Sequence, residues 1–180
     1  PGVFGQYWLG PIILLFSLIG STYTILYMLM RKILHTTLLE YLFVSTIFVL
    51  ATIQFTWSYY DAFFWYNGAM YYTLFYSFSL LLGSLLICYQ QTSSLIKKWG
   101  IGAFSICLAI IIAGGNFVSG LGIGAILFTS IILMRLEQKK WSYFNIVILV
   151  IYGISFATSV LAPGNTYRQS TVVDQPNIIV

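Results

Sequence analysis

The sequence predicts an all-α membrane protein, a polytopic transmembrane helix bundle of about six spans. Three observations predict this fold. The chain of 180 residues is 59% hydrophobic and only 7% charged, whereas soluble domains are about 25% charged. Its mean hydropathy is +0.91. Long apolar runs, close to the roughly 20 residues that a spanning helix requires, alternate with short polar connections.

The apolar runs define the expected spans in chain order. Four of them are single helices: Leu9–Met30, Thr37–Trp57, Tyr71–Gln90 and Tyr143–Leu161. The block Trp99–Met134 is too long for one helix and barely long enough for two. Gly114-Gly115-Asn116 near its middle is a turn signal. We expect a helical hairpin there, whose arms are either two full spans or a short, re-entrant pair.

The basic residues predict the orientation of the bundle. Seven of the eight Lys and Arg residues fall in alternate connections, which are 31–36, 91–98 and 135–142. Cytoplasmic connections carry the excess of Lys and Arg, so these three are expected inside. The expected outer segments are the loops 57–72 and 114–116 and the tail 162–180. The net charge of +4 then reflects topology and not a ligand patch.

The most unusual segment is the first outer connection, Trp57–Tyr72. Nine of its sixteen residues are aromatic, and it carries one acid, Asp61. Tyr and Trp prefer the boundary between water and lipid. We therefore expect this segment to be a loop that lies along one membrane surface.

Small residues predict where helices approach one another. Gly120 and Gly124 form a GxxxG pair, and Ser17 and Ser21 form a second pair of small residues at the same spacing. Such pairs allow close helix packing in lipid.

The residue inventory excludes several familiar functions. His35, the only histidine, is expected on the face opposite Asp61, which argues against a Ser-His-Asp relay. Cys88 and Cys107 lie inside apolar runs, so we expect packing and neither a disulfide framework nor a zinc site. The sequence has no phosphate-binding loop and no sign of nucleic-acid binding. No metal site and no cofactor are predicted, although a requirement for a divalent metal stays open.

Polar residues of the expected outer face form the candidate site. Asp61 among aromatic rings suits general-base work if it is partly desolvated. Arg168, the only outer basic residue, suits a phosphate or carboxylate. The candidate substrate-binding residues are Arg168, Asn165, Asn116, Tyr60, Tyr66 and Asn67. Structural alternatives stay open: a solvated loop acid, an Arg anchor or ion pair to Asp61, and asparagines that only form turns.

Two polar residues of the second span favour another function. Glu40, about one turn inside the span, could serve a proton relay, and Gln54 could line a cavity. With a broken hairpin at 114–116 they would form the midplane site of a transporter. The structural alternative for Glu40 is an ion pair with Arg31 or Lys32 near the inner surface.

Three motifs carry a resemblance to a known family. They are the tail Leu161–Arg168, which reads A-P-G-N-x-x-R, the aromatic segment Phe64–Tyr72, and Gly114-Gly115-Asn116. Together they resemble an uncharacterised family of bacterial polytopic membrane proteins. That family looks like the membrane-bound glucosyltransferases and other multi-span transferases that use lipid-linked sugars.

The resemblance implies a glycosyltransferase-like enzyme of the bacterial cell envelope, embedded in the lipid bilayer of the cytoplasmic membrane. It would transfer sugar from a polyprenyl-phosphate donor at the outer face, with Asp61 as the acid that assists the acceptor and Arg168 as the cation that holds the phosphate. The alternatives are a transporter or flippase for a lipid-linked or amphipathic substrate, and a non-enzymatic assembly protein.

One departure from the family pattern concerns the position of the main acidic motif. In such transferases this motif lies in the first outer loop near the N-terminus. The chain begins with Pro1 and ends within an apolar run. We therefore expect residues 1–180 to be a single transmembrane region of a longer protein, whose main acid could lie upstream.

Overall fold

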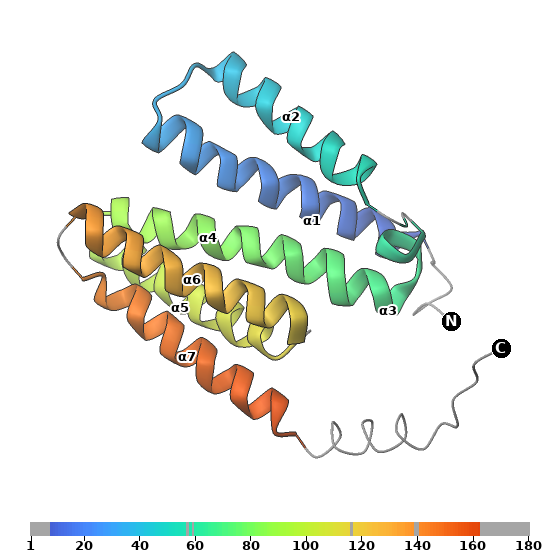
Figure 1. Cartoon of the computed structure of the whole chain (residues 1–180). Helices are drawn as coiled ribbons and strands as arrows, with labels where there is room; N and C mark the ends of the chain where they lie inside the picture. Colours follow the sequence, from blue (N-terminus) through green and yellow to red (C-terminus); the bar gives the residue numbers. More distant parts are fainter. Residues whose placement is uncertain (1–7, 57, 59, 116, 139–140, 163–180) are drawn as a thin grey trace.

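The computed structural model describes residues 8–56, 58, 60–115, 117–138 and 141–162, and every regular element in this part of the chain is helical (Figure 1). The predicted all-α bundle is confirmed. The long helices are α1 (Leu9–Leu26), α2 (Leu38–Gln54), α4 (Phe75–Gln91), α5 (Leu95–Ala113), α6 (Phe117–Gln138) and α7 (Tyr143–Val160). The short elements are α3 (Tyr66–Ala69) and three π-helical segments, η2 (Tyr27–Ile33), η3 (Tyr60–Phe64) and η4 (Met70–Leu74).

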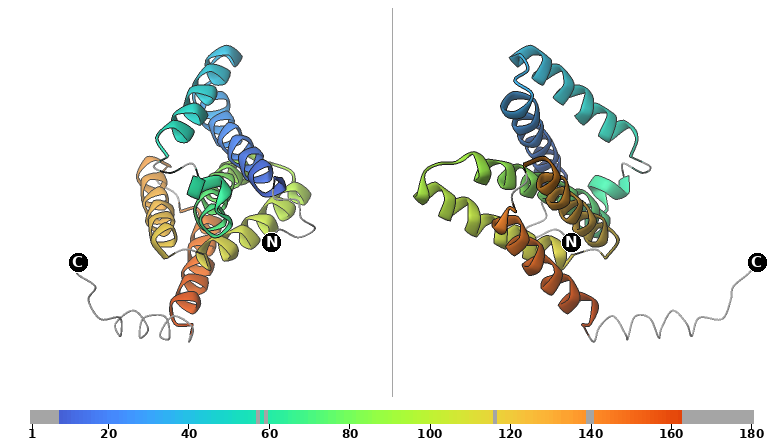
Figure 2. Two further views of the ribbon diagram at one scale, coloured as in Figure 1. Left: turned by 90° about the vertical axis from the view of Figure 1, so that its right-hand side faces the viewer. Right: turned by 60° about the vertical axis from the view of Figure 1, so that its left-hand side comes forward.

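Successive long helices run in roughly opposite directions. The order in which they pack side by side differs from their order in the chain. α1 packs against α2 and α4, α4 against α5, α5 against α7, and α7 against α6 (Figures 1 and 2). The main apolar core lies among α4, α5, α6 and α7 and includes Leu82, Leu108, Ile112 and Ile148. α2 lies at the edge of the bundle, where large apolar side chains such as Phe43 are exposed.

Five helices of the described chain are long and apolar enough to cross a membrane: Leu9–Ile33, Tyr71–Gln91, Leu95–Ala113, Ser119–Leu136 and Tyr143–Val160. α2 is apolar and has 17 residues, which is the lower end of the length of a spanning helix, about 17–25 residues. The six helices correspond to the six spans that the sequence predicts.

The ambiguous block separates into two long arms. α5 has 19 residues and α6 has 22, so each is about 28–33 Å long at 1.5 Å per residue. The first of the two alternatives, two full-length arms, therefore agrees with the structure. α5 begins at Leu95 and not at Trp99, which places Lys97 and Lys98 inside its first turns.

The aromatic segment differs from the expected loop. From Tyr60 onward the backbone is almost continuously helical, through η3, α3 and η4 into α4 (Figure 1). A helix pairs its backbone N–H and C=O groups within the segment, which is favourable where water is scarce. The aromatic side chains indicated a position at the membrane surface, but they carry no information about whether the backbone there is helical.

The Gly120–Gly124 pair lies where α6 meets α7. A Cβ atom at Gly120 would come within 2.9 Å of the Phe156 ring, and one at Gly124 within 3.4 Å of the Tyr152 ring. The glycines therefore lie at a helix contact, as predicted, and the space beside them is filled by aromatic rings of α7. The Tyr152 hydroxyl also donates a hydrogen bond of 2.8 Å to the Gly120 carbonyl.

Tyr152→Phe is expected to lower the free energy of unfolding by about 0.6 kcal/mol and at most about 1.7 kcal/mol, the range for interhelical hydrogen bonds in membranes. The ring, which is 2% exposed, keeps its packing, so only the hydrogen bond is lost. Unfolding by SDS in mixed micelles measures the change. Tyr143→Phe is the matched control, because the Tyr143 side chain is 78% exposed, and it should leave the unfolding curve in place.

Candidate functional site

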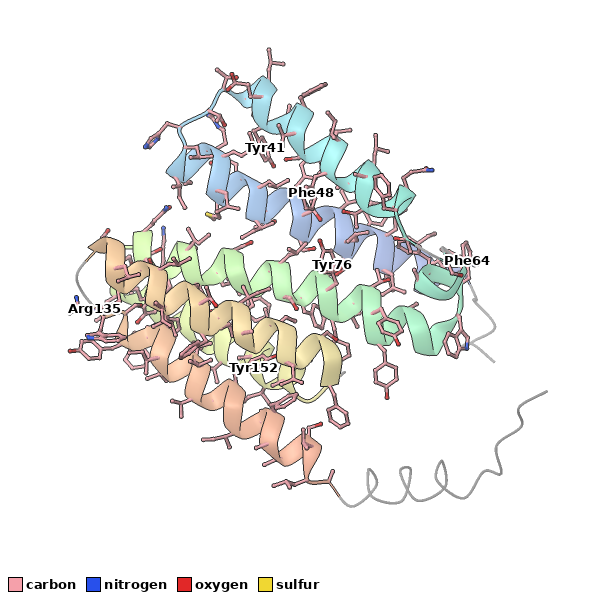
Figure 3. All side chains as sticks on the ribbon, in the orientation of Figure 1. Tyr41, Phe48, Phe64, Tyr76, Arg135 and Tyr152 are labelled. Carbon is pink, nitrogen blue, oxygen red and sulfur yellow. The ribbon has the colours of Figure 1, made fainter. Side chains whose placement is uncertain are left out.

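The two ends of the bundle differ in chemistry. Every Lys and Arg side chain that the structure describes lies at the end formed by the α1–α2, α4–α5 and α6–α7 connections, where Arg135 is labelled (Figure 3). The opposite end carries η3, α3 and η4, the α5–α6 connection and the last turn of α7. The predicted clustering of the basic connections at one end is confirmed for these residues; Lys139 and Lys140 lie outside the described residues.

The tryptophans mark the helix ends. Those whose placement the structure describes are all exposed: Trp8, Trp65, Trp99 and Trp141. Trp8 precedes α1, Trp65 separates η3 from α3, and Trp141 precedes α7. This distribution is typical of the aromatic belts of membrane proteins.

The segment that carries Asp61 is held against η4, which continues into α4. The Thr73 hydroxyl donates a hydrogen bond of 2.6 Å to the carbonyl of Ala62, the residue after Asp61. Ala69 in α3 is fully buried, and η3 and η4 pack against each other and against α1. The backbone of the candidate acid is therefore part of a packed helical unit at the aromatic end.

The structure places the backbones of four candidate site residues close together. Tyr60 and Asp61 lie in η3, and Tyr66 and Asn67 lie in α3, which packs against η3. Their side chains are outside what the structure describes. Three further candidates lie outside the described residues altogether: Asn116, Asn165 and Arg168. Their assignment to the site therefore stays a prediction.

An apolar cavity adjoins the segment that carries Asp61. It is a wide, open hollow in the bundle surface, and Trp8 and Phe64 in its lining are exposed. Its volume is about 490 Å³. Its described lining is entirely non-polar and comes from the start of α1, the end of α2 and η3: Trp8, Pro11, Ile12, Leu15, Ile53, Phe63 and Phe64. Phe63 and Phe64 follow Asp61 by only two and three residues in η3. Figure 3 labels Phe64 at this end of the bundle.

Hydrogen bonds and ring contacts join α1 and η2 to α2 in the half of the pair far from this cavity. The Tyr41 hydroxyl donates to the Tyr23 carbonyl at 3.1 Å, and the hydroxyls of Tyr23 and Thr46 are 2.8 Å apart. The Tyr41 ring also packs edge-on against those of Tyr23 and Tyr27. These contacts join the two helices near the basic end, and the cavity lies at the other end of the same pair.

Glu40 has a local structural role at the start of α2. Its carboxylate accepts a hydrogen bond of 2.8 Å from the Thr37 N–H, and the Thr37 hydroxyl accepts one of 3.3 Å from the Glu40 N–H. This reciprocal pair is a capping box at the start of α2. The alternative ion pair with Arg31 or Lys32 is not formed among these described side chains, and Arg31 donates to the Thr36 carbonyl instead.

The residues proposed for a midplane site lie far apart. Glu40 and Gln54 are at opposite ends of α2, about 21 Å apart at 1.5 Å per residue. Gly114 and Gly115 lie in the predicted turn, which follows the last residue of α5 and is therefore at a helix end. His35 lies between η2 and α2 at the basic end, opposite the segment that carries Asp61, as expected.

Sequence reasoning missed the apolar cavity and its lining residues. In a membrane protein, apolar side chains face lipid, core and cavities alike, so Ile12 and Ile53 carry no distinguishing signal. The capping box was readable, because Thr37 and Glu40 have the Thr-x-x-Glu spacing before an apolar run.

Together, the apolar helices, the exposed aromatic residues at their ends and the one-sided charge define the class: a multi-pass helical membrane protein. Searches for similar proteins found no family model that matches the chain and no match among curated proteins or solved structures.

Proposed function

We propose that the protein is a glycosyltransferase-like enzyme of the bacterial cell envelope that takes sugar from a polyprenyl-phosphate donor at the outer face of the cytoplasmic membrane. The observation that carries this proposal is the apolar cavity beside the segment with Asp61. Its volume is within the usual range for small-molecule sites, about 300–1,000 Å³. A lining without polar residues suits an isoprenoid chain and does not suit a water-soluble substrate.

The orientation of the bundle is part of the proposal. Because cytoplasmic connections carry the excess of Lys and Arg, the end with Arg31, Lys98 and Arg135 faces the cytoplasm and the aromatic end faces outward. A donor held by its isoprenoid chain in the cavity then presents its phosphate and sugar at the outer surface. That is the level of η3 and α3.

The proposed reaction transfers the sugar in one displacement. The hydroxyl oxygen of the acceptor attacks the anomeric carbon, and its proton passes to the carboxylate of Asp61. The bond between the anomeric carbon and the phosphate oxygen breaks, and its electron pair stays on the departing polyprenyl phosphate. Arg168 stabilises that phosphate by paired hydrogen bonds.

The remaining candidates bind the sugar. Asn116, Asn165 and Asn67 would hydrogen-bond sugar hydroxyls, and the rings of Tyr60 and Tyr66 would pack on its apolar face. The reaction requires no cofactor, and a divalent metal at the phosphate is compatible with it.

The transporter alternative has less support. Its proposed polar groups lie at both ends of α2 and at the end of α5, so they do not surround a common midplane site. In addition, the Glu40 carboxylate is engaged in the capping box. An assembly protein without a small-molecule site predicts instead that filling the cavity has no functional effect.

Filling the cavity tests the proposed donor site. Ile12→Trp is expected to raise the apparent KM for the donor about tenfold. The larger side chain would exclude part of the isoprenoid chain from the cavity, and leaving about two of its methylene groups unburied costs ~0.8 kcal/mol each. The assay measures release of polyprenyl phosphate from polyprenyl-phosphate sugars by the full-length protein in lipid nanodiscs. Ile13→Trp is the matched control, because Ile13 is 60% exposed and does not line the cavity.

Two results would count against the proposal. If no donor releases polyprenyl phosphate in the presence of the unaltered protein, the transferase function is wrong. If release occurs but both Trp variants keep the original KM, the cavity is not the donor site.

A further inference from the structure

A second groove lies at the basic end of the bundle, remote from the proposed transfer site. Its volume is about 370 Å³, and it is lined by the end of α4, the start of α5 and the start of α7. Nearly all its lining surface is apolar, and Lys98 is the one charged side chain in its described lining. The groove is therefore apolar along its length and has one cation, Lys98, at its rim.

Aromatic rings form one wall of this groove. The Tyr89 and Phe144 rings stack with centroids 3.7 Å apart. Gly102 lies against them, since a Cβ there would be 3.5 Å from Phe144 and 3.6 Å from Tyr89. Without a side chain at position 102, the rings can pack against α5, and Ala103 beside it leaves the groove open on its exposed face.

Lys98 is positioned at the rim by the same wall. Its Nζ lies 5.6 Å from the centre of the Tyr89 ring, within the range of a cation–π contact. The side chain is half-buried, whereas the neighbouring Lys97 is exposed and does not line the groove. The exposed Trp99 lies beside Lys98 on the rim and marks the level of the lipid headgroups.

The local charge favours an anion at the rim. Lys97 and Lys98 lie in the first turns of α5, where the helix dipole is positive, and that turn contains no acidic residue. The described lining of the groove contains no acid either. A negative group at the rim would therefore be attracted by Lys98, and an apolar tail attached to it would be accommodated in the groove.

We propose that this groove binds an anionic phospholipid of the bilayer, with one acyl chain along the Tyr89–Phe144 wall and the phosphate at Lys98. The complementarity of charge and the apolar lining identify the occupant. Basic pockets between membrane helices at the cytoplasmic side bind anionic headgroups in this manner. The site is independent of the transferase function, because it lies at the other end of the bundle.

The test uses Trp99 as the reporter. In a variant with Trp8, Trp57, Trp65 and Trp141 replaced by Phe, the fluorescence of Trp99 is quenched by lipids brominated on the acyl chain. Brominated phosphatidylglycerol is compared with brominated phosphatidylcholine at equal mole fractions. We expect phosphatidylglycerol to bind about fivefold more tightly, as one lysine near the surface predicts.

Matched variants separate the groove from general surface charge. Lys98→Gln should reduce the ratio of the affinities for phosphatidylglycerol and phosphatidylcholine to about one. Lys97→Gln should leave this ratio close to that of the unaltered protein. Ala103→Phe, which fills the groove, should weaken binding of both lipids, whereas Ala125→Phe, at an exposed position of α6, should not. Helical circular dichroism establishes that each variant is folded.

Three outcomes would overturn the proposal: equal quenching by the two lipids, equal losses for Lys97→Gln and Lys98→Gln, or unchanged binding in Ala103→Phe. A second measurement covers the case in which the single-tryptophan variant does not fold. Native mass spectrometry of the unaltered sequence should then detect retained phosphatidylglycerol that Lys98→Gln loses, and retention that does not depend on Lys98 would contradict the assignment.

Discussion

Asp61→Asn is expected to lower the rate of polyprenyl phosphate release by about 100-fold or more, the usual contribution of a general base. The amide keeps the size of the side chain but cannot accept the proton of the acceptor hydroxyl. The backbone of this segment is held by the Thr73–Ala62 hydrogen bond and the packing of η3 on η4, so the exchange should leave the fold intact. The measurement is donor cleavage by the full-length protein in nanodiscs.

Glu40→Gln is the matched control at the other end of the bundle. Glutamine can still accept the Thr37 N–H, so the capping box is kept, and transfer should continue at the original rate. A transporter that uses Glu40 as a proton relay predicts the reverse: loss of transport in Glu40→Gln and little change in Asp61→Asn.

Arg168→Ala completes the comparison. Removal of the cation proposed to hold the phosphate should raise the donor KM and slow departure of polyprenyl phosphate. If transfer occurs and neither Asp61→Asn nor Arg168→Ala changes it, the site assignment is wrong.

Gly115→Ala is expected to be strongly destabilising, because a Cβ at Gly115 makes a closer contact than one at Gly102, Gly120 or Gly124. The new Cβ would overlap the Phe75 ring, at 2.5 Å from Cζ and 2.8 Å from Cδ1. Phe75 cannot move freely, because it packs against the main core and lies roughly parallel to Tyr71, with ring centres 6.5 Å apart. Overpacking of this kind costs about 1–3 kcal/mol of unfolding free energy.

The neighbouring glycine provides a control within the same turn. A Cβ at Gly114 would make only an ordinary contact, 3.4 Å from the Ile110 carbonyl oxygen, so Gly114→Ala should change stability little. In the double variant Gly115→Ala/Phe75→Leu, the smaller side chain should restore part of the loss. Equal effects of the two alanines in SDS unfolding would show that the clash with Phe75 is not the cause.

The α5–α6 turn is important for the site as well as for stability. Gly115 brings this turn against Phe75 at the start of α4, and α4 continues directly from η4. A shift of Phe75 would therefore reach the packed unit that contains Asp61. Gly115→Ala should accordingly lower transfer as well as stability.

Sequence reasoning was most successful for features that depend on local composition. The apolar helices Tyr71–Gln91, in which η4 continues into α4, and Tyr143–Val160 agree with the predicted spans to within about one residue at each end, because a spanning helix must satisfy its backbone internally and face lipid with apolar side chains. The alternation of basic connections also placed Arg31, Lys98 and Arg135 at one end of the bundle. Each of these features can be read within about 20 residues of sequence.

The candidate site was predictable only in part. The grouping of η3 with α3 follows from their nearness in the sequence, since Asp61 and Asn67 are six residues apart. Whether Asn116, Asn165 and Arg168 join them depends on contacts between distant segments. The sequence suggests such contacts only through the resemblance of its motifs.

By itself, the sequence determined the membrane class of the protein, its bundle of about six long apolar helices and the separation of charge between its two ends, because lipid imposes length and composition on every crossing helix. The tertiary structure decided which helices are neighbours, that the aromatic segment is helical, and where the apolar cavity at the aromatic end and the groove at the basic end lie. The reason is that lipid and protein interior are equally apolar. Ile12, which lines a cavity, and Ile13, which does not, are indistinguishable until the helices are packed.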